Sequence, residues 1–372
     1  MSANYKKLGD YITQRREKNT AINLPICGLC REGLIPPKQQ DADISLYNVF
    51  YKNDFIFNPA RMELNSITLN TEYDKAICSS LYEIFYINDT SKLLPEFLFV
   101  QLKTDNFVRF CEFQGQGSVR EYCRFANISE YPVIVPDLKE QEKIVNTYNA
   151  ITKRIQLKQK INENLEKTAQ TIYRKMFVED ADKNWKIGKL SDYCKFQEGY
   201  VNPPQEYPEY FDGMIKWLRA VDINESYVLN TSRTLTDLGF KSAGTSALLF
   251  KPNTIAITKS GTIGRLAIIS DFMCGNRAII NIEPNEKLYL PFIHQYLKSR
   301  QKEFLDMSVG SVQKNLYVSI LAELPIIKPE LSSVEEYYKT VECLYEQKLY
   351  NCKEISKLQE LKQLVISRIS GM

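Results

Sequence analysis

Two short stretches, far apart in the sequence, combine glycine with hydroxyl, amide and cationic side chains. They read FQGQGSVREYCR and SVGSVQKNLYV. Such side chains can hydrogen-bond to phosphates and to the edges of bases, with no bulky groups in the way. We therefore expect both stretches to be loops that contact nucleic acid. The candidate residues are Gln116, Ser118, Arg120 and Arg124 in the first stretch, and Ser311, Gln313, Lys314 and Asn315 in the second.

A second pair of polar stretches, NPARMELNS and TKSGTIGRLA, lies earlier in each half of the chain. Their candidate contact residues are Arg61 and Asn65 in the first, and Lys259, Ser260, Thr262 and Arg265 in the second; Arg31 and Arg219 complete the candidate DNA-binding set. Any one of these residues could equally belong to an ordinary solvated turn. Polar loops at corresponding places in both halves favour binding.

Several enzyme motifs are incomplete in this chain. A DNA amino-methyltransferase needs an Asn/Asp-Pro-Pro-aromatic segment, but NPAR at Asn58 lacks the second proline and NPPQ at Asn202 lacks the aromatic residue. GQG at Gly115 does not stand between a strand and a helix, and KSGTIGR lacks the Gly-Lys-Ser/Thr end of a phosphate-binding loop. We predict no catalytic residue and no nucleotide site.

The sequence offers few residues for a metal site or for catalysis by histidine. Cys27 and Cys30 form one C-x-x-C pair, but no second pair or nearby histidine completes a four-ligand zinc site. The single histidine, His294, lies in LPFIHQYLKSRQKEF, which has the spacing of an amphipathic helix, so we expect a surface or core position. We predict no metal site.

The composition is that of an ordinary globular protein, with 44% hydrophobic and 25% charged residues. A length of 372 residues favours two domains. We see no apolar run long enough to cross a bilayer, and MSANYKKLGDY lacks the apolar core of a secretory signal, so we expect a cytoplasmic protein with nine reduced cysteines. A formal charge of +3 permits nucleic-acid binding without indicating it.

The chain repeats itself, which determines how its elements are arranged. KLGDY, beginning at Lys7, returns as KLSDY at Lys189, a shift of 189 − 7 = 182 residues. GSV at Gly117 returns at Gly310, a shift of 310 − 117 = 193 residues, and prolines further on keep this second shift. The second copy therefore holds 193 − 182 = 11 additional residues between these landmarks.

A helix with a heptad seam of core positions follows each copy, over about 33 residues or roughly 50 Å. Because an isolated helix would leave this seam in water, we predict that the two helices pair as an antiparallel coiled coil. The alternative, two unrelated amphipathic core helices, does not explain their shared register. The pairing residues are Ile144, Tyr148, Ile151, Ile155, Asn162, Leu165 and Ile172 in the first helix, and Tyr337, Val341, Leu344, Asn351, Ile355, Leu358, Val365 and Ile369 in the second.

These patterns predict an α+β fold with two similar domains, each followed by one long helix. Each half mixes short strands, such as DFIFNP and NTIAITKS, with a later helix that begins with Leu-Pro. The expected segments are a first domain at 1–137, a central spacer helix at 138–180, a second domain at 181–331 and a C-terminal spacer helix at 332–372.

The order domain, helix, domain, helix resembles the specificity subunit of a type I restriction-modification system. The resemblance covers nearly the whole chain and rests on four stretches. These are VPDLKEQEKI at the first exit, FIFNPAR in the first half, and IKWLRAVDI and ITKSGTIGRLAI in the second half. The second exit, KPELSSVEEYY, departs from the pattern because it lacks the Glu-Gln pair.

The resemblance implies that each domain is a target recognition domain for one half of a bipartite double-stranded DNA sequence. It implies that the helices space these domains and dock two methyltransferase subunits, with restriction/translocase subunits as further partners. The chain itself would hold no cofactor. S-adenosylmethionine, ATP and magnesium would serve those partners, and this chain would be a non-catalytic subunit.

Two other interpretations stay open at this point. The chain would look the same as the specificity subunit of a fused, type IIB-like restriction-methylation enzyme, which neighbouring genes would distinguish. A coiled-coil scaffold without a DNA role is the second alternative. DNA-binding measurements with the methyltransferase partner present would separate a scaffold from a DNA reader.

Overall fold

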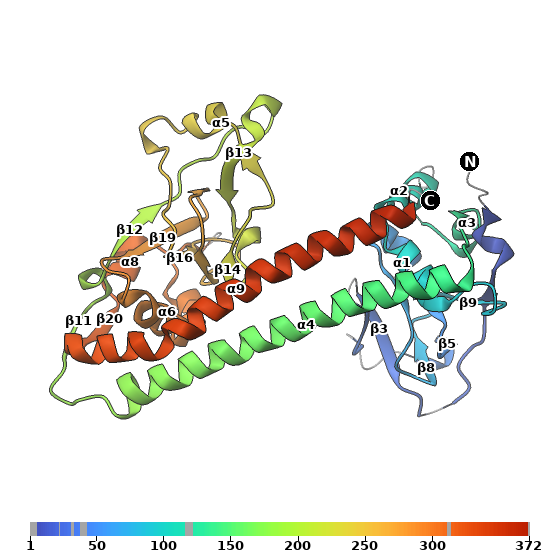
Figure 1. The fold of residues 1–372 in the computed structure, drawn as a ribbon, viewed down its shortest axis with the longest axis horizontal. Helices are drawn as coiled ribbons and strands as arrows, with labels where there is room; N and C mark the ends of the chain where they lie inside the picture. The colour runs from blue at the N-terminus through green and yellow to red at the C-terminus, as the bar shows by residue number, and fades with distance from the viewer. Residues whose placement is uncertain are drawn as a thin grey trace. The chain divides into compact units, whose positions relative to one another are not determined.

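The computed structural model describes residues 6–21, 23–30, 33–37, 43–115, 122–310 and 314–370. The chain divides into two compact units: unit 1 is Met1–Ile155 with Lys357–Met372, and unit 2 is Gln156–Ser356. Two long helices, α4 (Leu138–Arg174) and α9 (Leu331–Ser370), contribute a segment to each unit (Figure 1). Each unit therefore combines a globular region with part of a helix pair.

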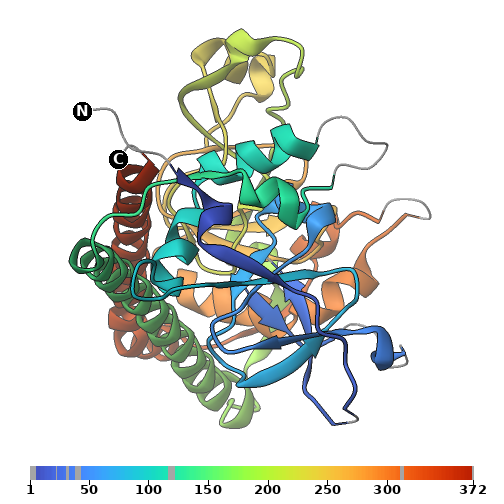
Figure 2. The ribbon, with the colours of Figure 1, turned by 90° about the vertical axis from the view of Figure 1, so that its right-hand side faces the viewer.

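The globular region of unit 1 is built on two sheets, whose strands face the viewer in Figure 2. The first sheet has the order β2 (Ile12–Arg15), β9 (Glu83–Ile87), β6 (Phe55–Phe57), β7 (Ile67–Leu69), and the second has the order β4 (Gly33–Ile35), β3 (Ile26–Cys30), β8 (Lys75–Cys78), β5 (Asn48–Tyr51). A further pair joins β1 (Lys6–Lys7) to β10 (Pro132–Val133), and the short helices are α1 (Pro95–Leu102), α2 (Asp105–Gly115) and α3 (Phe125–Ser129).

Apolar strands form the buried centre of the first sheet in unit 1. All three residues of β6 are buried, as expected for a strand that is covered on both faces. Phe55 stacks on Phe85 of β9, with ring centroids 4.8 Å apart. The turn that follows β6 therefore leaves from a strand in the core of unit 1.

Unit 2 has a corresponding sheet with one more strand and a larger insertion. The main sheet has the order β12 (Cys194–Glu198), β19 (Ile279–Pro284), β16 (Thr254–Thr258), β17 (Leu266–Ile269), β14 (Tyr227–Val228). The insertion forms a sheet of β15 (Thr234–Leu235), β13 (Phe211–Leu218) and β18 (Cys274–Gly275), while β11 (Lys186–Lys189) pairs with β20 (Pro325–Lys328). The short helices are α5 (Asp237–Lys241), α6 (Tyr289–Ser299), α7 (Phe304–Met307) and α8 (Val318–Ala322).

The sequence repeat reappears as repeated contacts. In unit 1 the Leu8 amide donates to the Tyr131 carbonyl at 2.9 Å, and in unit 2 the Leu190 amide donates to the Leu324 carbonyl at 2.9 Å. The ion pairs Lys7–Glu130 and Lys189–Glu323, each 2.6 Å long, lie beside these bonds. The partners in both contacts differ by the predicted shifts of 182 and 193 residues. In both units, these contacts join the start of the globular region to the segment just before the long helix. We call this repeated arrangement of backbone and contacts the frame.

The two long helices pack against each other in antiparallel fashion within each unit. In unit 1, Ile144 and Tyr148 near the start of α4 share a core with Ile366 and Ile369 near the end of α9. In unit 2, Asn351 donates its side-chain amide to Asn162 at 2.8 Å, and the Tyr337 hydroxyl donates to the Ala169 carbonyl at 3.4 Å. Residue numbers rise along one helix as they fall along the other, which confirms the predicted direction.

Most predicted seam residues are buried, and the rest are half-buried. The buried ones are Ile144, Tyr148, Ile151, Ile155, Asn162, Tyr337, Val341, Asn351 and Ile369. The half-buried ones are Leu165, Ile172, Leu344, Ile355, Leu358 and Val365. The predicted α+β fold class with a paired helix after each domain is confirmed.

Candidate nucleic-acid interface

In each unit, two polar stretches that are distant in sequence meet at one junction. In unit 1 the amide of Cys123, after α2, donates to the carbonyl of Pro59, in the turn between β6 and β7. The distance of this bond is 3.0 Å. In unit 2, the amide of Leu316 donates to the carbonyl of Lys259 at 2.9 Å. The junction thus joins the turn after the central strand to the loop that precedes the last short helix.

Arg124 lies at the junction of unit 1 with two partners. Its Nη1 atom is 3.3 Å from a carboxylate oxygen of Glu83, and its guanidinium lies 5.1 Å from the ring centroid of Tyr122. The Arg124 side chain is 63% exposed, whereas that of Glu83 is 16% exposed. A half-buried carboxylate and an aromatic ring therefore hold a cation that solvent and a ligand can reach.

Glu83 is itself fixed by the backbone around it. One carboxylate oxygen accepts from the Phe125 amide at 2.8 Å and from the Gln14 side chain at 3.2 Å. Glu83 stands at the start of β9, so the main sheet sets its position. No sequence pattern indicated this role, because a lone glutamate at a strand end has no characteristic spacing.

A cavity of about 610 Å³ opens beside this cluster in unit 1. Its lining includes Arg61, Arg124, Glu83, Tyr82 and Tyr122. Arg61 is exposed in the short helix Pro59–Leu64, whose first turn is capped by the side chain of Asn58, accepting from the Ala60 amide at 3.1 Å. Two cations, a carboxylate and aromatic rings suit a flat, polar ligand group such as a base.

Asn65 serves the fold of this turn. It adopts a left-handed conformation, φ 52°, at the end of the short helix. Glycine is the commonest residue at such a position, and asparagine is also favoured there. Its side chain is only 8% exposed and donates to the Leu102 carbonyl at 2.8 Å. We therefore leave Asn65 out of the interface proposed below.

Lys259 occupies the junction of unit 2. Its ammonium lies 2.8 Å from Glu198 and 5.6 Å from the ring centroid of Tyr317. Tyr200 donates to the other oxygen of Glu198 at 2.8 Å. Burial raises the pKa of Glu198, but the hydrogen bonds from Lys259 and Tyr200 outweigh burial and keep this pKa below its ordinary value. The carboxylate is therefore ionised at neutral pH and holds the lysine.

The rest of this turn is a compact hairpin. The Thr258 hydroxyl donates to the Thr262 carbonyl and accepts from the Arg265 amide, at 2.9 Å in the second case. Gly264 has φ 86°, and a Cβ there would lie 3.0 Å from the ring of Phe304. Glycine is therefore required at this position both for its backbone angle and for the space.

The remaining candidates that the structure describes lie in unit 2. In the turn itself, Thr262 is exposed, Ser260 is half-buried, and Arg265 lies 3.8 Å from Glu225. Arg219 donates to the Ser232 hydroxyl at 2.6 Å and lies over the Trp217 ring. Lys314 is exposed, and Asn315 exchanges two backbone hydrogen bonds with Val309. Arg31, Gln116, Ser118, Arg120, Ser311 and Gln313 lie outside the described residues.

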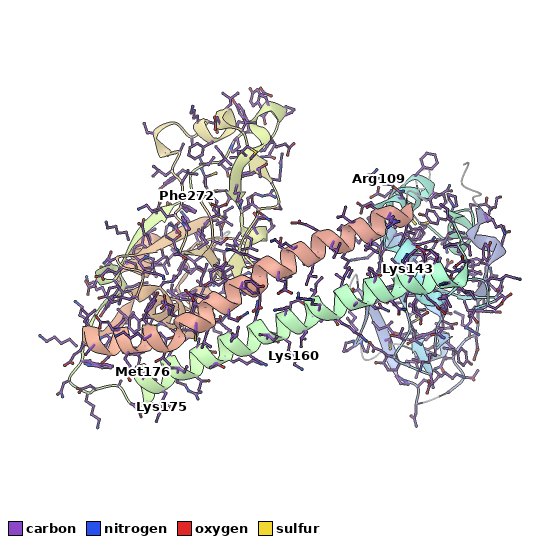
Figure 3. The ribbon with its side chains drawn as sticks, in the orientation of Figure 1. Arg109, Lys143, Lys160, Lys175, Met176 and Phe272 are labelled. Carbon is purple, nitrogen blue, oxygen red and sulfur yellow. The ribbon has the colours of Figure 1, made fainter. Side chains whose placement is uncertain are left out.

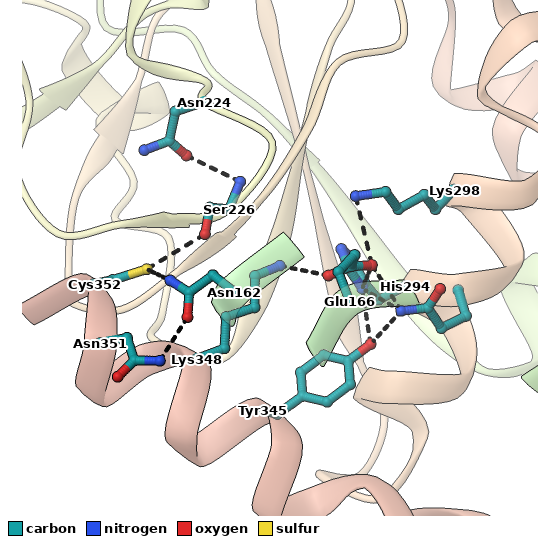
Figure 4. Close-up of polar contacts among 11 residues, drawn as sticks. Asn162, Glu166, Asn224, Ser226, His294, Lys298, Tyr345, Lys348, Asn351 and Cys352 are labelled. Carbon is teal, nitrogen blue, oxygen red and sulfur yellow. Dashed lines mark hydrogen bonds and ion pairs between the residues drawn. The ribbon is translucent and has the colours of Figure 1, made fainter. Parts of the chain in front are cut away.

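A buried polar cluster that we did not predict lies in unit 2 (Figure 4). Glu166 of α4 forms ion pairs with Lys348 of α9 and, at 3.4 Å, with Lys298 of α6. Burial disfavours the charged form of Glu166, but the two ammonium groups outweigh burial and hold the pKa of Glu166 well below its usual range. The carboxylate stays charged, and it ties α6 to both long helices.

His294 completes this cluster as a neutral group. Gln295 donates to the Tyr345 hydroxyl at 3.0 Å, and that hydroxyl lies 2.8 Å from Nδ1 of His294. In the neutral ring with its proton on Nε2, Nδ1 can accept from this hydroxyl. Burial lowers the pKa of His294 to about 4, so the ring is uncharged at neutral pH. The histidine lies in the core, one of its two expected positions.

Membrane spans and metal clusters are absent from the part of the chain that the structure describes. Within that part, no helix combines the length and the apolar character that a membrane span requires. The same residues contain no group of three or more His, Cys, Asp or Glu side chains arranged to hold a metal ion. Cys27 is buried in β3, and Cys30 is half-buried at the end of that strand.

Comparison with known proteins gives concordant matches. The family model described as "Type I restriction modification DNA specificity domain" matches residues 38–167 and 182–363. The type I restriction enzyme MjaIX specificity subunit of Methanocaldococcus jannaschii is 23% identical over 300 residues, 74% of this chain and 68% of that protein. The HindI specificity subunit of Haemophilus influenzae is 20% identical over 379 residues, 81% of this chain and 82% of that protein.

A solved structure shares the fold. The S subunit of a type I restriction-modification system from M. genitalium superimposes with a TM-score of 0.59. The match covers 99% of this chain and 96% of that one, at 15% sequence identity. At this level of identity, the likeness concerns the arrangement of the backbone.

Proposed function

This chain belongs to the family of type I restriction-modification specificity subunits, which recognise DNA sequences, and we propose that each of its units reads one half of a bipartite target. The observation that carries the proposal is the duplicated junction. The bond from Cys123 to Pro59 in unit 1 and that from Leu316 to Lys259 in unit 2 place polar loops at the same point of the same frame. Two copies of one reading surface suit a target with two halves.

The DNA-contacting surface that we propose consists of exposed or half-buried polar residues at the two junctions, together with Arg219 of unit 2. Arginine and lysine supply phosphate contacts and base contacts, while hydroxyl and amide groups supply both more weakly. In the described residues, the set is Arg61 and Arg124 in unit 1, and Arg219, Lys259, Ser260, Thr262, Arg265, Lys314 and Asn315 in unit 2.

We further propose that the long helices dock methyltransferase subunits, and through them restriction subunits. Support comes from apolar side chains that face solvent on the helices. In unit 2, Leu157 is 60% exposed and Ile161 is 36% exposed, one helical turn apart on α4. Lys160, also in unit 2, and Lys143, in unit 1, are exposed on α4 as well, so the helix offers cationic as well as apolar contacts (Figure 3). In this proposal the chain itself catalyses no reaction.

The test is an exchange of one recognition domain. The full chain is co-expressed with its methyltransferase subunits, and methylated positions are mapped across the genome by sequencing. Replacing residues 1–136 with the corresponding domain of another family member is expected to change one half of the methylated sequence. The reciprocal exchange of residues 181–331 serves as the control and should change the other half.

Two results would overturn the proposal. If either exchange changed both halves, one unit could not be assigned to one half-site. If the complex methylated DNA without regard to sequence, the chain would not be its DNA-reading subunit. Methyl transfer by the chain without its partners would refute the non-catalytic role.

A further inference from the structure

We propose that each unit reads a guanine of its half-site with a cation that a carboxylate and a tyrosine hold in place. We name the two groups the Arg124 cluster (Arg124, Glu83 and Tyr122) and the Lys259 cluster (Lys259, Glu198 and Tyr317). The inference rests on the proposed function, because it assigns base discrimination to residues of the two DNA-reading units. Glu83 and Glu198 act as positioning residues, and neither was among the candidates drawn from the sequence.

Guanine is the base whose exposed edge fits such a cation. In the major groove it presents two acceptors, N7 and O6, and arginine or lysine is their commonest protein partner. Arg124 is 63% exposed and uses Nη1 for Glu83. A guanidinium has five N–H donors in a planar fork, so donors remain for both acceptors of guanine.

Lys259 can donate to the same guanine acceptors, but from a more enclosed position than that of Arg124. Its ammonium carries three donors, of which Glu198 takes one at 2.8 Å. The side chain is 17% exposed, so it can contact only a group that enters the junction between the turn and the late loop. The partial exposure and the fixed contact with Glu198 suit a cation that makes one directed contact, as with a base edge, rather than a diffuse contact with the DNA backbone.

The clusters are not copies made by the duplication. The shift of 193 residues carries Arg124 to Tyr317, an aromatic residue, and the carbonyl of Lys259 occupies the place held by the carbonyl of Pro59 in unit 1. Each unit therefore builds a cation, a carboxylate and a tyrosine at its junction from different chain positions. The same combination also occurs away from the junctions, for example at Arg15 with Asp54 and Tyr51, so the Arg124 and Lys259 clusters are distinguished by their place at the two junctions.

The geometry of Glu83 allows its charge to be removed while its hydrogen bond to the backbone stays. One oxygen accepts from the Phe125 amide at 2.8 Å, and the other faces Arg124. In Glu83→Gln the side-chain oxygen can still accept from that amide, while the charged contact with Arg124 is lost. This variant tests positioning without removing the anchor of the loop.

The experiment uses the complex of the full chain with its methyltransferase subunits and the target found by methylation mapping. Dissociation constants are measured for duplexes in which each base pair of either half-site is replaced in turn. Arg124→Gln, Arg124→Lys and Glu83→Gln are compared with Arg109→Gln. Arg109 is an exposed arginine of α2 that lines a different cavity in the same unit (Figure 3), and so it is the matched charge control.

In Arg124→Gln we expect discrimination at one G·C pair of one half-site to fall by about 5- to 150-fold, with the other half-site unchanged. Arg124→Lys keeps the charge but loses the fork, so discrimination at that pair should fall while the salt dependence of binding stays the same. Glu83→Gln should reduce discrimination at the same pair. Lys259→Gln and Glu198→Gln should do so at a G·C pair of the other half-site, and Arg109→Gln at none.

Other outcomes overturn the inference while leaving the proposed function intact. If Arg124→Gln weakened binding equally for all duplexes, with a smaller salt slope, Arg124 would be a phosphate contact. If the affected pair were A·T, the assignment of guanine would be wrong. If the wild-type complex showed no preference in either half-site, the proposed function itself would fail, and the two failures are thus distinguishable.

Discussion

The neutral, buried His294 makes the stability of unit 2 depend on pH in a predictable direction. Its ordinary pKa is 6.5 and burial lowers it to about 4 in the folded protein. Below pH 6.5 the unfolded chain binds a proton that the folded chain does not, so stability is complete above pH 6.5 and is lost as the pH falls toward 4. The groups that face the ring are Glu166 of α4, Gln295 and Lys298 of α6, and Tyr345 and Lys348 of α9.

The magnitude follows from the size of the pKa change. A decrease from 6.5 to about 4 is about 2.5 pH units, and each unit corresponds to about 1.4 kcal/mol. The full contribution is therefore about 3 kcal/mol near pH 4, and about 2 kcal/mol of it is already lost at pH 5. At pH 5 most ordinary carboxylates are still ionised, so they contribute less to the change than His294 does.

The assay is urea unfolding at pH 8 and pH 5, followed by tryptophan fluorescence. Both tryptophans of the chain, Trp185 and Trp217, lie in unit 2, so the signal reports on that unit. In His294→Asn the side-chain oxygen can still accept from Tyr345, but the group no longer titrates. We expect the variant to lose about 2 kcal/mol less than the wild type between pH 8 and pH 5.

Tyr345→Phe is the matched control, because it removes the hydrogen bond to the ring and leaves the histidine in place. It should lower stability at pH 8, while the loss of stability between pH 8 and pH 5 stays close to that of the wild type. Equal pH dependence in the wild type and His294→Asn would refute the reasoning. It would mean that the ring is hydrated or already charged in the folded protein.

Two further predictions concern the helix pair and the turn after β16. Replacing both Asn162 and Asn351 with leucine should raise the free energy of unfolding by about 1 kcal/mol or more, because a buried polar pair costs stability but fixes the register of the helices. The same change should broaden the spin-label distance distributions between α4 and α9. A lower free energy of unfolding would contradict this prediction. Gly264→Ala should destabilise unit 2 by about 1–3 kcal/mol more than Gly244→Ala, measured by the same fluorescence assay. Both glycines have positive φ, but a Cβ meets Phe304 only at the first, and equal effects would exclude that contact as the cause.

The frame of this fold was predictable because it follows from local sequence patterns that occur twice. The shift of 182 residues, visible as KLGDY against KLSDY, relates Leu8 to Leu190, and the shift of 193 residues, visible in GSV, relates Tyr131 to Leu324. A heptad seam also states which residues of a helix must be covered, and burial of Tyr337 agrees with it. The sequence repeat and the heptad seam can both be recognised from residue spacing alone, without knowing how the chain runs between the elements.

The junctions and the buried cluster were not predictable in the same way. That the turn near Pro59 touches the loop at Cys123 depends on the packing of α2 against the short helix after β6, which the sequence does not state. Glu166 lies beside the seam of α4, and its partner Lys298 comes from α6, so only the packing of three helices brings them together. Asn65 carried a usable signal, since asparagine after a short helix favours a left-handed cap.

Under the proposed function, the duplicated frame would also explain how the two units can differ in what they read. Its defining contacts, such as Leu8 to Tyr131 and Leu190 to Leu324, join backbone amides to backbone carbonyls. Such bonds tolerate most changes of side chain, so the junction stays in place while the residues around it vary. Arg124 and Lys259 reach their junctions from different chain positions within that constant frame. If the proposed function holds, a change of recognised base would require substitutions around a junction and would leave the core and the helix pair undisturbed.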